Sequence, residues 1–523
     1  MEVAAYDPFV DHSDVPMLAL DELISSSDAI SLHLPLTEDT RHMVDGDFLA
    51  RMRPGGFLVN TARFALAESL SYFQQARDLL AAQGQTQSRL AATIALGLAD
   101  VHLGLGDPAA AVNDLRQVVE VPLLDLPPEM HGGALRRMAA ARQRMGEFNA
   151  ALENLHAARQ LLSSATMAAG TGDLRGTAAA TPEAEREAWT VELELAQTLF
   201  RMGDAQRDRA QSQAQHVLRG LDRRRHPELA AETLNLLGGI ARLHGDMDNA
   251  VQFVREGLAL YQAYGNRSGA AAAYANLGIL AANLRDSETA FSHFNLSLNL
   301  REALGDSLGI AISRNNLGNL ERNRGHFAEA IEQLTRAAER ARYAEAAPLL
   351  AQCLTNLGQA QSLAGQHALA VVTFDEAEGV STGFGLKSTQ CEVAWKRADC
   401  LVETGDLAAA ERAAVAALAL AREVNSGYLR SEAQRALARA LRLSGNATGA
   451  VEHAGTAWQA REKDSNPHLR ARFAAEFALA LLATGDPTQA AQAHDLLTAN
   501  VNPVQLPESA FTLREIAAAV ASV

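Results

Sequence analysis

A chain of 523 residues is too long for a single hydrophobic core, so its length predicts either about three or four domains or a stacked array of repeats. Hydrophobic residues make up 48% of the sequence, which excludes wholesale disorder, and the aromatic content of only 5% beside abundant alanine favours closely packed helices. The net charge of −16 argues against a surface that neutralises phosphates, so we expect no nucleic-acid partner.

The sequence also bears on the compartment of the protein. It has no stretch of about 18 apolar residues that would cross a bilayer, and its N-terminus lacks the basic start of a signal peptide. The cysteines Cys353, Cys391 and Cys400 form neither a disulfide framework nor a paired metal motif. We therefore expect a cytoplasmic protein with no membrane partner.

The first 63 residues alternate short apolar runs with amphipathic stretches, a pattern that is typical of an α/β fold. The runs VAAYDPF, AISLHLPL and GFLVNTA predict buried parallel strands. The stretches LDELISSSD and DGDFLARMRPGG predict the helices and turns between those strands. Residues 1–63 are therefore predicted to be a small α/β fragment.

This order of motifs closely resembles the NAD-binding domain of D-2-hydroxyacid dehydrogenases, particularly phosphoglycerate dehydrogenase. The resemblance implies that Asp7, which closes the YDP segment, corresponds to the residue that binds the adenosine ribose of NAD. It places Pro35 and Thr40 in a loop beside the cofactor, and Thr61 in the NTAR segment, also on the cofactor side. The substrate-binding, catalytic arginine of the family falls on Arg63.

Several parts that this family requires are missing from the sequence. Met1 lies after the place where the first strand and its G-x-G-x-x-G turn should stand, so no backbone cradle for the pyrophosphate is expected. Phe64 replaces the glycine that follows the arginine, and the catalytic Glu and His have no counterparts. We therefore expect a vestigial fragment without catalysis and without a cofactor, with NAD bound only if another chain completes the fragment.

The rest of the chain repeats one pattern: a helix that ends in Leu-Gly or Leu-Ala, a glycine-centred turn, and an alanine followed four residues later by an apolar residue. Arg285 stands where one turn glycine is missing. The turn glycines are Gly106, Gly146, Gly203, Gly245, Gly325, Gly365, Gly405, Gly445 and Gly485. From Gly245 onward every step is 40 residues, so the array is regular.

The clearest copies are YANLGILAANLRDSETAFSHF, NNLGNLERNRGHFAEAIEQL and TNLGQAQSLAGQHALAVVTF. Small residues at two places of each copy allow its two helices to pack closely. These residues are Gly278, Gly318, Gly358, Ala290, Ala330 and Ala370. The pattern resembles the tetratricopeptide family, with Leu-Gly in the first helix of a unit (helix A) and Ala-x-x-x-Phe in the second (helix B). The resemblance implies a mainly α-helical solenoid of about ten helix pairs.

Two irregularities divide this array. Phe64 to Ala82 predicts a helix B with no helix A before it, so the dehydrogenase fragment and the repeats are both cut at the same junction. We interpret the junction as a fusion by recombination or a gene-model artefact, and the alternative is an NAD-sensing module on a scaffold.

The second irregularity lies between Gly146 and Gly203, where a segment rich in Gly, Ala, Ser and Thr predicts a flexible loop over 163–183. Thr181 is the expected N-cap of the next helix and Pro182 its first residue. The predicted parts of the chain are therefore 1–63, 64–162, 163–183 and 184–523.

Helix A positions spaced i, i+3, i+4 and i+7 share one face of the helix, and in the tetratricopeptide family that face lines the inner wall. Transferring this register predicts a polar stripe that binds an acidic or extended peptide through amide and guanidinium groups. The predicted partner groove comprises Asn315, Asn319, Arg322, Asn323, Gln352, Thr355, Gln359, Trp395, Asp399, Arg435, Arg439 and Arg442. The alternative is that these residues form only a solvated helix face.

Other chemistry is not indicated. The histidines and cysteines lack the His-x-x-x-His and Cys-x-x-Cys spacings, so we predict no metal site. The sequence predicts a catalytically inactive scaffold that binds a protein or peptide partner. Two alternatives remain open: an NAD-dependent oxidoreductase, and the sensory part of a bacterial transcriptional or signalling regulator. A G-x-G-x-x-G turn with Glu and His would mark the first, and a Walker loop or helix-turn-helix the second.

Overall fold

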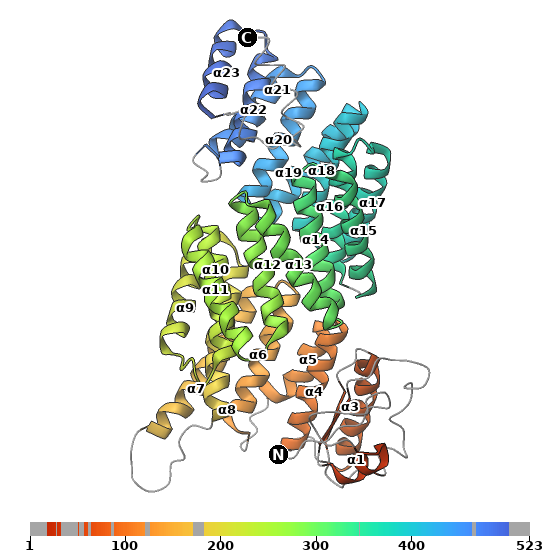
Figure 1. The fold of residues 1–523 in the computed structure, drawn as a ribbon, viewed down its shortest axis with the longest axis vertical. Helices are drawn as coiled ribbons and strands as arrows, with labels where there is room; N and C mark the ends of the chain where they lie inside the picture. Colours follow the sequence, from red (N-terminus) through yellow and green to blue (C-terminus); the bar gives the residue numbers. More distant parts are fainter. Residues whose placement is uncertain are drawn as a thin grey trace. The chain divides into compact units, whose positions relative to one another are not determined.

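The computed structural model describes residues 18–27, 29–32, 51, 57–60, 64–84, 88–120, 126–170, 182–344, 346–462 and 467–500. The chain divides into two compact units, unit 1 at Met1–Leu221 and unit 2 at Asp222–Val523, and helices dominate the described part of each (Figure 1). None of the described helices combines the length and the apolar character that crossing a bilayer would require. The predicted mainly α-helical solenoid, preceded by a small α/β fragment, is confirmed.

Unit 1 begins with the α/β fragment, which contains α1 (Leu20–Ser26), β1 (Ala29–Leu32) and β2 (Phe57–Asn60). The two strands pair in parallel, with Ala29 opposite Phe57 and Leu32 opposite Asn60. A parallel pair requires a crossover connection, as the alternating pattern predicted. The helix expected at LDELISSSD and two of the three expected strands are present, whereas VAAYDPF lies outside the described residues.

The rest of unit 1 is a series of helices. They are α3 (Phe64–Ala82), α4 (Arg89–Leu105), α5 (Pro108–Val119), α6 (Pro128–Arg144), α7 (Phe148–Gly170), α8 (Pro182–Arg201), the short 3₁₀ turn η1 (Asp204–Gln206) and α9 (Arg207–Gly220). The helix without a partner before it, α3, packs its Leu70, Phe73 and Leu80 against Ile94 and Leu98 of α4. The helix that follows α3 therefore covers part of its apolar face.

The loop predicted over 163–183 begins later than expected. Helix α7 continues to Gly170, and α8 begins at Pro182 as predicted. Adding residues to an existing helix gains one hydrogen bond per residue fixed, and the alanines and methionine of this stretch favour the helix. Residues 171–181, including the expected N-cap Thr181, lie outside the described part of the chain.

Unit 2 is a run of helix pairs in which even-numbered helices are helix A and odd-numbered helices are helix B. They are α10 (Pro227–Leu243), α11 (Met247–Ala263), α12 (Arg267–Asn283), α13 (Ser287–Ala303), α14 (Ser307–Asn323), α15 (Phe327–Tyr343), α16 (Ala347–Leu363), α17 (His367–Gly383), α18 (Lys387–Thr404), α19 (Leu407–Glu423), α20 (Gly427–Leu443), α21 (Ala447–Gln459), α22 (Pro467–Leu482) and α23 (Pro487–Asn500). Each helix A of unit 2 packs on its own helix B and on neighbouring A helices, and from α12 onward it also packs on the helix B before it.

The turn between helix A and helix B explains the spacing of the glycines. Every turn glycine of the repeat has a positive φ, from 71° at Gly485 to 93° at Gly203, and Arg285 adopts the same left-handed conformation with φ 66°. Glycine meets this requirement without steric cost, whereas arginine does not. In several units an Asp or Asn next to this position then caps helix B through its side chain, as Asp286 does for α13.

The small residues of the repeat lie where helix A meets helix B, as predicted. A Cβ atom added at Gly278 would lie 2.5 Å from the Phe294 ring, and one added at Gly318 would lie 2.5 Å from Leu334. Ala290 and Ala330, on the facing helices, are fully buried. These contacts bring the two helices of one unit close together.

Candidate partner-binding wall

The predicted groove residues lie on the A helices α14, α16, α18 and α20 of unit 2. These helices contact one another in chain order, and α20 also contacts α22. We call the surface that these five helices share the helix-A wall. Because one unit repeats every 40 residues, equivalent side chains of successive units become neighbours on this wall.

Burial corrects the prediction that the whole stripe faces a partner. Asn315, Thr355, Trp395, Arg435 and Arg439 are buried. Each of these A helices packs against helices on several sides, so most of its circumference is covered. A helix face that carries polar residues is therefore not necessarily exposed to solvent. Partly buried positions of the stripe are Asn319, Arg322, Gln359, Asp399 and Arg442. Asn323 and Gln352 are exposed.

Side-chain amides join the A helices of successive units, both within the wall, from α14 to α16, and before it, from α10 to α12. Asn356 Nδ2 donates to Asn315 Oδ1 at 2.9 Å, and Asn276 Nδ2 donates to Asn235 Oδ1 at 3.2 Å. Sequence analysis named Asn315 but missed the other three. The signal was present for two of them, because Asn276 and Asn356 directly precede the Leu-Gly of helix A in their copies.

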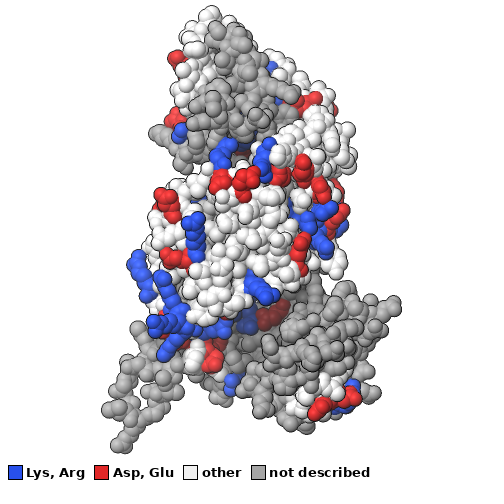
Figure 2. Space-filling model, in the orientation of Figure 1, with Lys and Arg blue, Asp and Glu red and all other residues white. Residues whose placement is uncertain are grey.

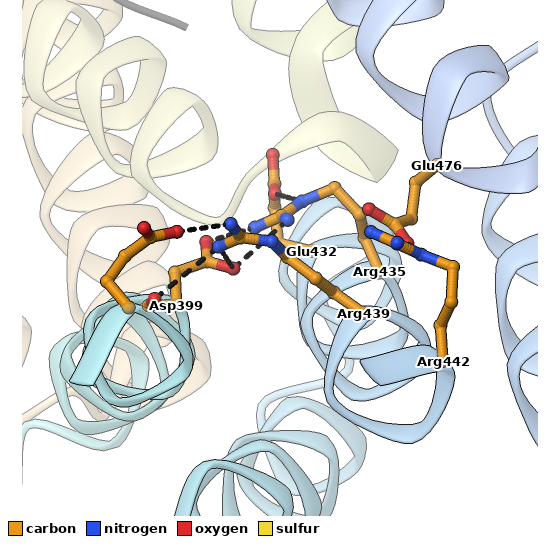
Figure 3. A network of polar contacts seen from close by, with 7 residues as sticks. Asp399, Glu432, Arg435, Arg439, Arg442 and Glu476 are labelled. Atoms are coloured by element: carbon orange, nitrogen blue, oxygen red, sulfur yellow. Dashed lines mark hydrogen bonds and ion pairs between the residues drawn. The ribbon is translucent and has the colours of Figure 1, made fainter. Parts of the chain in front are cut away.

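The arginines of α20 make internal ion pairs (Figure 3). Arg435 binds Asp399 through two hydrogen bonds, of 3.2 and 2.5 Å, and its Nε atom donates to Glu432 at 3.1 Å. Arg439 approaches the same Asp399 at 3.5 Å and pairs with Glu403. The guanidinium groups of Arg435 and Arg439 are therefore both already bound by carboxylates.

The same network continues to α22. Arg442 Nε lies 3.0 Å from the buried Glu476, and Arg472 pairs with the buried Glu432. Burial opposes ionisation of Asp399, but Arg435 and Arg439 outweigh burial and hold its pKa below the usual range. On the face drawn in Figure 2, acidic and basic side chains of the described residues are likewise interspersed. The arginine stripe of α20 is thus part of a mixed-charge network between units.

Trp395 lies inside this network. Lys396 Nζ is 5.5 Å and Arg435 Cζ is 5.6 Å from the centroid of its ring system, within the range of cation–π attraction. The buried indole Nε1 has no hydrogen-bond partner in the described part of the chain.

A second cluster of polar side chains lies on α14, α16 and α18. The buried Lys396 donates to Glu392 at 2.6 Å and to Asn356 at 3.5 Å. Burial is the main reason that the pKa of Lys396 is lowered, although Glu392 opposes this effect. Arg322 donates to Gln359 Oε1 at 2.9 Å and to Asn323 Oδ1 at 3.3 Å. Both acceptors of Arg322 are neutral amides.

The other candidate residues give no site. The vestigial residues Asp7, Pro35, Thr40, Thr61 and Arg63 all lie outside the described residues. Within the described ranges, no three His, Cys, Asp or Glu side chains are grouped to hold a metal ion.

The thiols of Cys353, Cys391 and Cys400 are free and buried. Burial raises the pKa of Cys353 to about 12 and that of Cys391 to about 11. Thiols with such pKa values are poor nucleophiles at neutral pH, which favours a structural role for them.

Comparison with known families identifies both parts of the chain. The stacked helix pairs define an α-solenoid, and residues 229–303, 269–342 and 309–381 match the tetratricopeptide repeat family. Residues 1–71 match the family of D-isomer specific 2-hydroxyacid dehydrogenases, NAD binding domain. The chain therefore carries tetratricopeptide repeats behind a fragment of a dehydrogenase NAD-binding domain, as the sequence predicted.

The similar curated proteins match only the front of the chain. The chain is 40% identical over 84 residues to (S)-sulfolactate dehydrogenase of Chromohalobacter salexigens, a match that covers 15% of this chain and 27% of that enzyme. It is 40% identical over 77 residues to hydroxypyruvate reductase of Thermotoga maritima, covering 14% and 25%. The chain thus spans about a quarter of the length of these two enzymes.

Solved structures also resemble the chain, at low sequence identity. A Rap protein complexed with competence and sporulation factor gives a TM-score of 0.47 at 15% identity, covering 64% of this chain and 92% of that one. Yeast Tom70 gives a TM-score of 0.41 at 15% identity, covering 88% and 96%.

Proposed function

We propose that this chain is a catalytically inactive, cytoplasmic scaffold that binds an extended segment of a protein partner along the helix-A wall of unit 2. The observation that carries the proposal is the alignment of amide side chains from successive units on one surface. An extended peptide presents a donor and an acceptor at each residue, and amide side chains satisfy both kinds of group.

The open part of the wall supports this assignment. Gln352 and Asn323 are exposed there, and the buried Asn356 and Asn315 hold neighbouring helices in register behind them. A surface with regularly spaced polar side chains on rigid helices is suited to bind the backbone of a peptide more than any particular side chain of it. The three free cysteines suit a reducing compartment.

Selection of peptides tests the proposal. The full chain and a variant lacking one 40-residue unit, residues 306–345, are each used to select from a random-peptide library. The remaining helices still stack, because each unit contacts mainly its neighbours, but wall residues on either side of the deletion are displaced. We expect peptides that bind the full chain and not the shortened one, while circular dichroism shows a folded helical protein in both. Failure of the full chain to enrich any peptide would refute the proposal.

A second candidate function rests on the match of residues 1–71 to a dehydrogenase NAD-binding domain. It would make the chain an oxidoreductase that binds NAD. The third possibility, the sensory part of a bacterial transcriptional or signalling regulator, shares the peptide-binding wall and would be recognised by the identity of the captured partner.

A further inference from the structure

Within the helix-A wall, Arg322 differs from the arginines of α20 in having no carboxylate partner. Arg435, Arg439 and Arg442 each lie within 3.5 Å of a carboxylate oxygen. Arg322 has no ion pair among the described residues, and its two hydrogen bonds go to the neutral amides of Gln359 and Asn323. These two hydrogen bonds replace part of the hydration that the partly buried guanidinium has lost, but they do not balance its charge.

The neighbouring carboxylate does not provide that counter-ion. Glu392 forms its ion pair with Lys396 at 2.6 Å, so those two charges cancel. Glu392 attracts Arg322 at longer range, yet burial outweighs that attraction and lowers the pKa of Arg322 to about 10. One positive charge therefore remains on the wall where α14, α16 and α18 lie side by side.

We propose that Arg322, flanked by Lys396, is an anion-binding subsite of the helix-A wall, and that it selects a partner segment with an internal Asp or Glu side chain. This inference rests on the proposed function and adds to it the charge of the partner. Lys396 contributes indirectly: its ammonium holds Glu392 in an ion pair, so this carboxylate does not neutralise Arg322. The exposed amide of Asn323, which accepts a hydrogen bond from Arg322, would hold the backbone of the segment beside that carboxylate.

The experiment uses peptides selected by the full chain from a library displayed as N-terminal fusions, so that no peptide has a free C-terminal carboxylate. Each selected sequence is synthesised with an amidated C-terminus, together with an analogue in which the acidic residue is replaced by its amide. Kd values are measured by fluorescence anisotropy for the wild-type chain, Arg322→Met and Arg412→Met. Arg412 is an exposed arginine of α19, outside the wall, and controls for the change in net charge.

We expect the Kd of the acidic peptide to be about tenfold lower than the Kd of its amide analogue, both on the wild-type chain and on Arg412→Met. A tenfold change in Kd corresponds to the free energy of one charge-assisted hydrogen bond. On Arg322→Met the two peptides should bind alike. Selected peptides that lack an acidic preference, or a preference that persists on Arg322→Met, would overturn the subsite and leave the proposed function intact. No selected peptides at all would overturn both.

Thermal melting provides a test that needs no peptide. Because Arg322 has no counter-ion in the fold, Arg322→Met should not lower the melting temperature, whereas Arg435→Met should lower it by several degrees by leaving Asp399 short of a partner. A loss of melting temperature in Arg322→Met as large as that in Arg435→Met would show that the fold already compensates Arg322, and would overturn the inference.

Discussion

Arg435 and Asp399 form a bidentate ion pair between α20 and α18 in which Arg435 is only 6% exposed. Replacing Arg435 by Ala should lower the free energy of unfolding by about 3 kcal/mol, because a largely buried Asp399 loses its main partner. The exposed Arg412→Ala should change it by less than about 0.5 kcal/mol. Urea unfolding followed by circular dichroism measures both. Equal, small effects would contradict the network as a stabilising contact.

The same pair makes stability depend on pH. The pKa of Asp399 is lower in the folded chain than in the unfolded chain, so its contribution is complete above the unfolded value of about 3.9 and is lost as the pH falls through the folded value. The Asp399→Asn variant should therefore be less stable than the wild-type chain at pH 7. As the pH is lowered from 5 into the acid range, it should lose less stability than the wild-type chain does.

At the scale of the helix pair, the turn between helix A and helix B provides a matched comparison. Arg285 holds a positive φ of 66° that favours glycine, and Gly325 holds the same place one unit later with φ 83°. Arg285→Gly should raise the free energy of unfolding by about 1 kcal/mol by relieving backbone strain. Gly325→Ala should lower it by about 1 kcal/mol, and since an added Cβ there meets no atom within 4 Å, that loss comes from the backbone alone. The midpoints of urea unfolding give the sign of each change in the free energy of unfolding. If Arg285→Gly lowered this free energy, the contacts of the arginine side chain would stabilise the fold by more than its backbone conformation destabilises it.

At the scale of the whole molecule, the question is whether residues 1–63 contribute function. The sequence contains no G-x-G-x-x-G turn, so titration with NADH should give no saturable binding at micromolar concentrations. Deleting residues 1–63 should preserve the cooperative melt, because α3 already packs its Leu80 against α4. Saturable NADH binding would support the oxidoreductase alternative, and loss of the melt would make both parts one folding unit.

Sequence reasoning was most successful for features that each unit specifies locally. The position of a turn depends on glycine tolerating a positive φ, and the approach of two helices depends on Gly278 and Gly318 lacking a Cβ atom. It missed a second set of left-handed residues, at Gly265, Gly305, Gly385 and Asn425, which lie in the loops between units. The end of α7 was also misplaced, since composition alone does not set where a helix stops.

The sequence by itself determined the repeat, its 40-residue period and the two families joined in one chain, because turn chemistry and small-residue packing are encoded within each unit. Only the tertiary structure decided which polar residues are available to a partner. Arg435 and Arg439 were predicted to bind a ligand, yet they are buried against carboxylates that arrive from other helices, whereas Arg322 on the same wall has none. Helical periodicity places a residue on a face, and only the neighbouring units determine what that face meets.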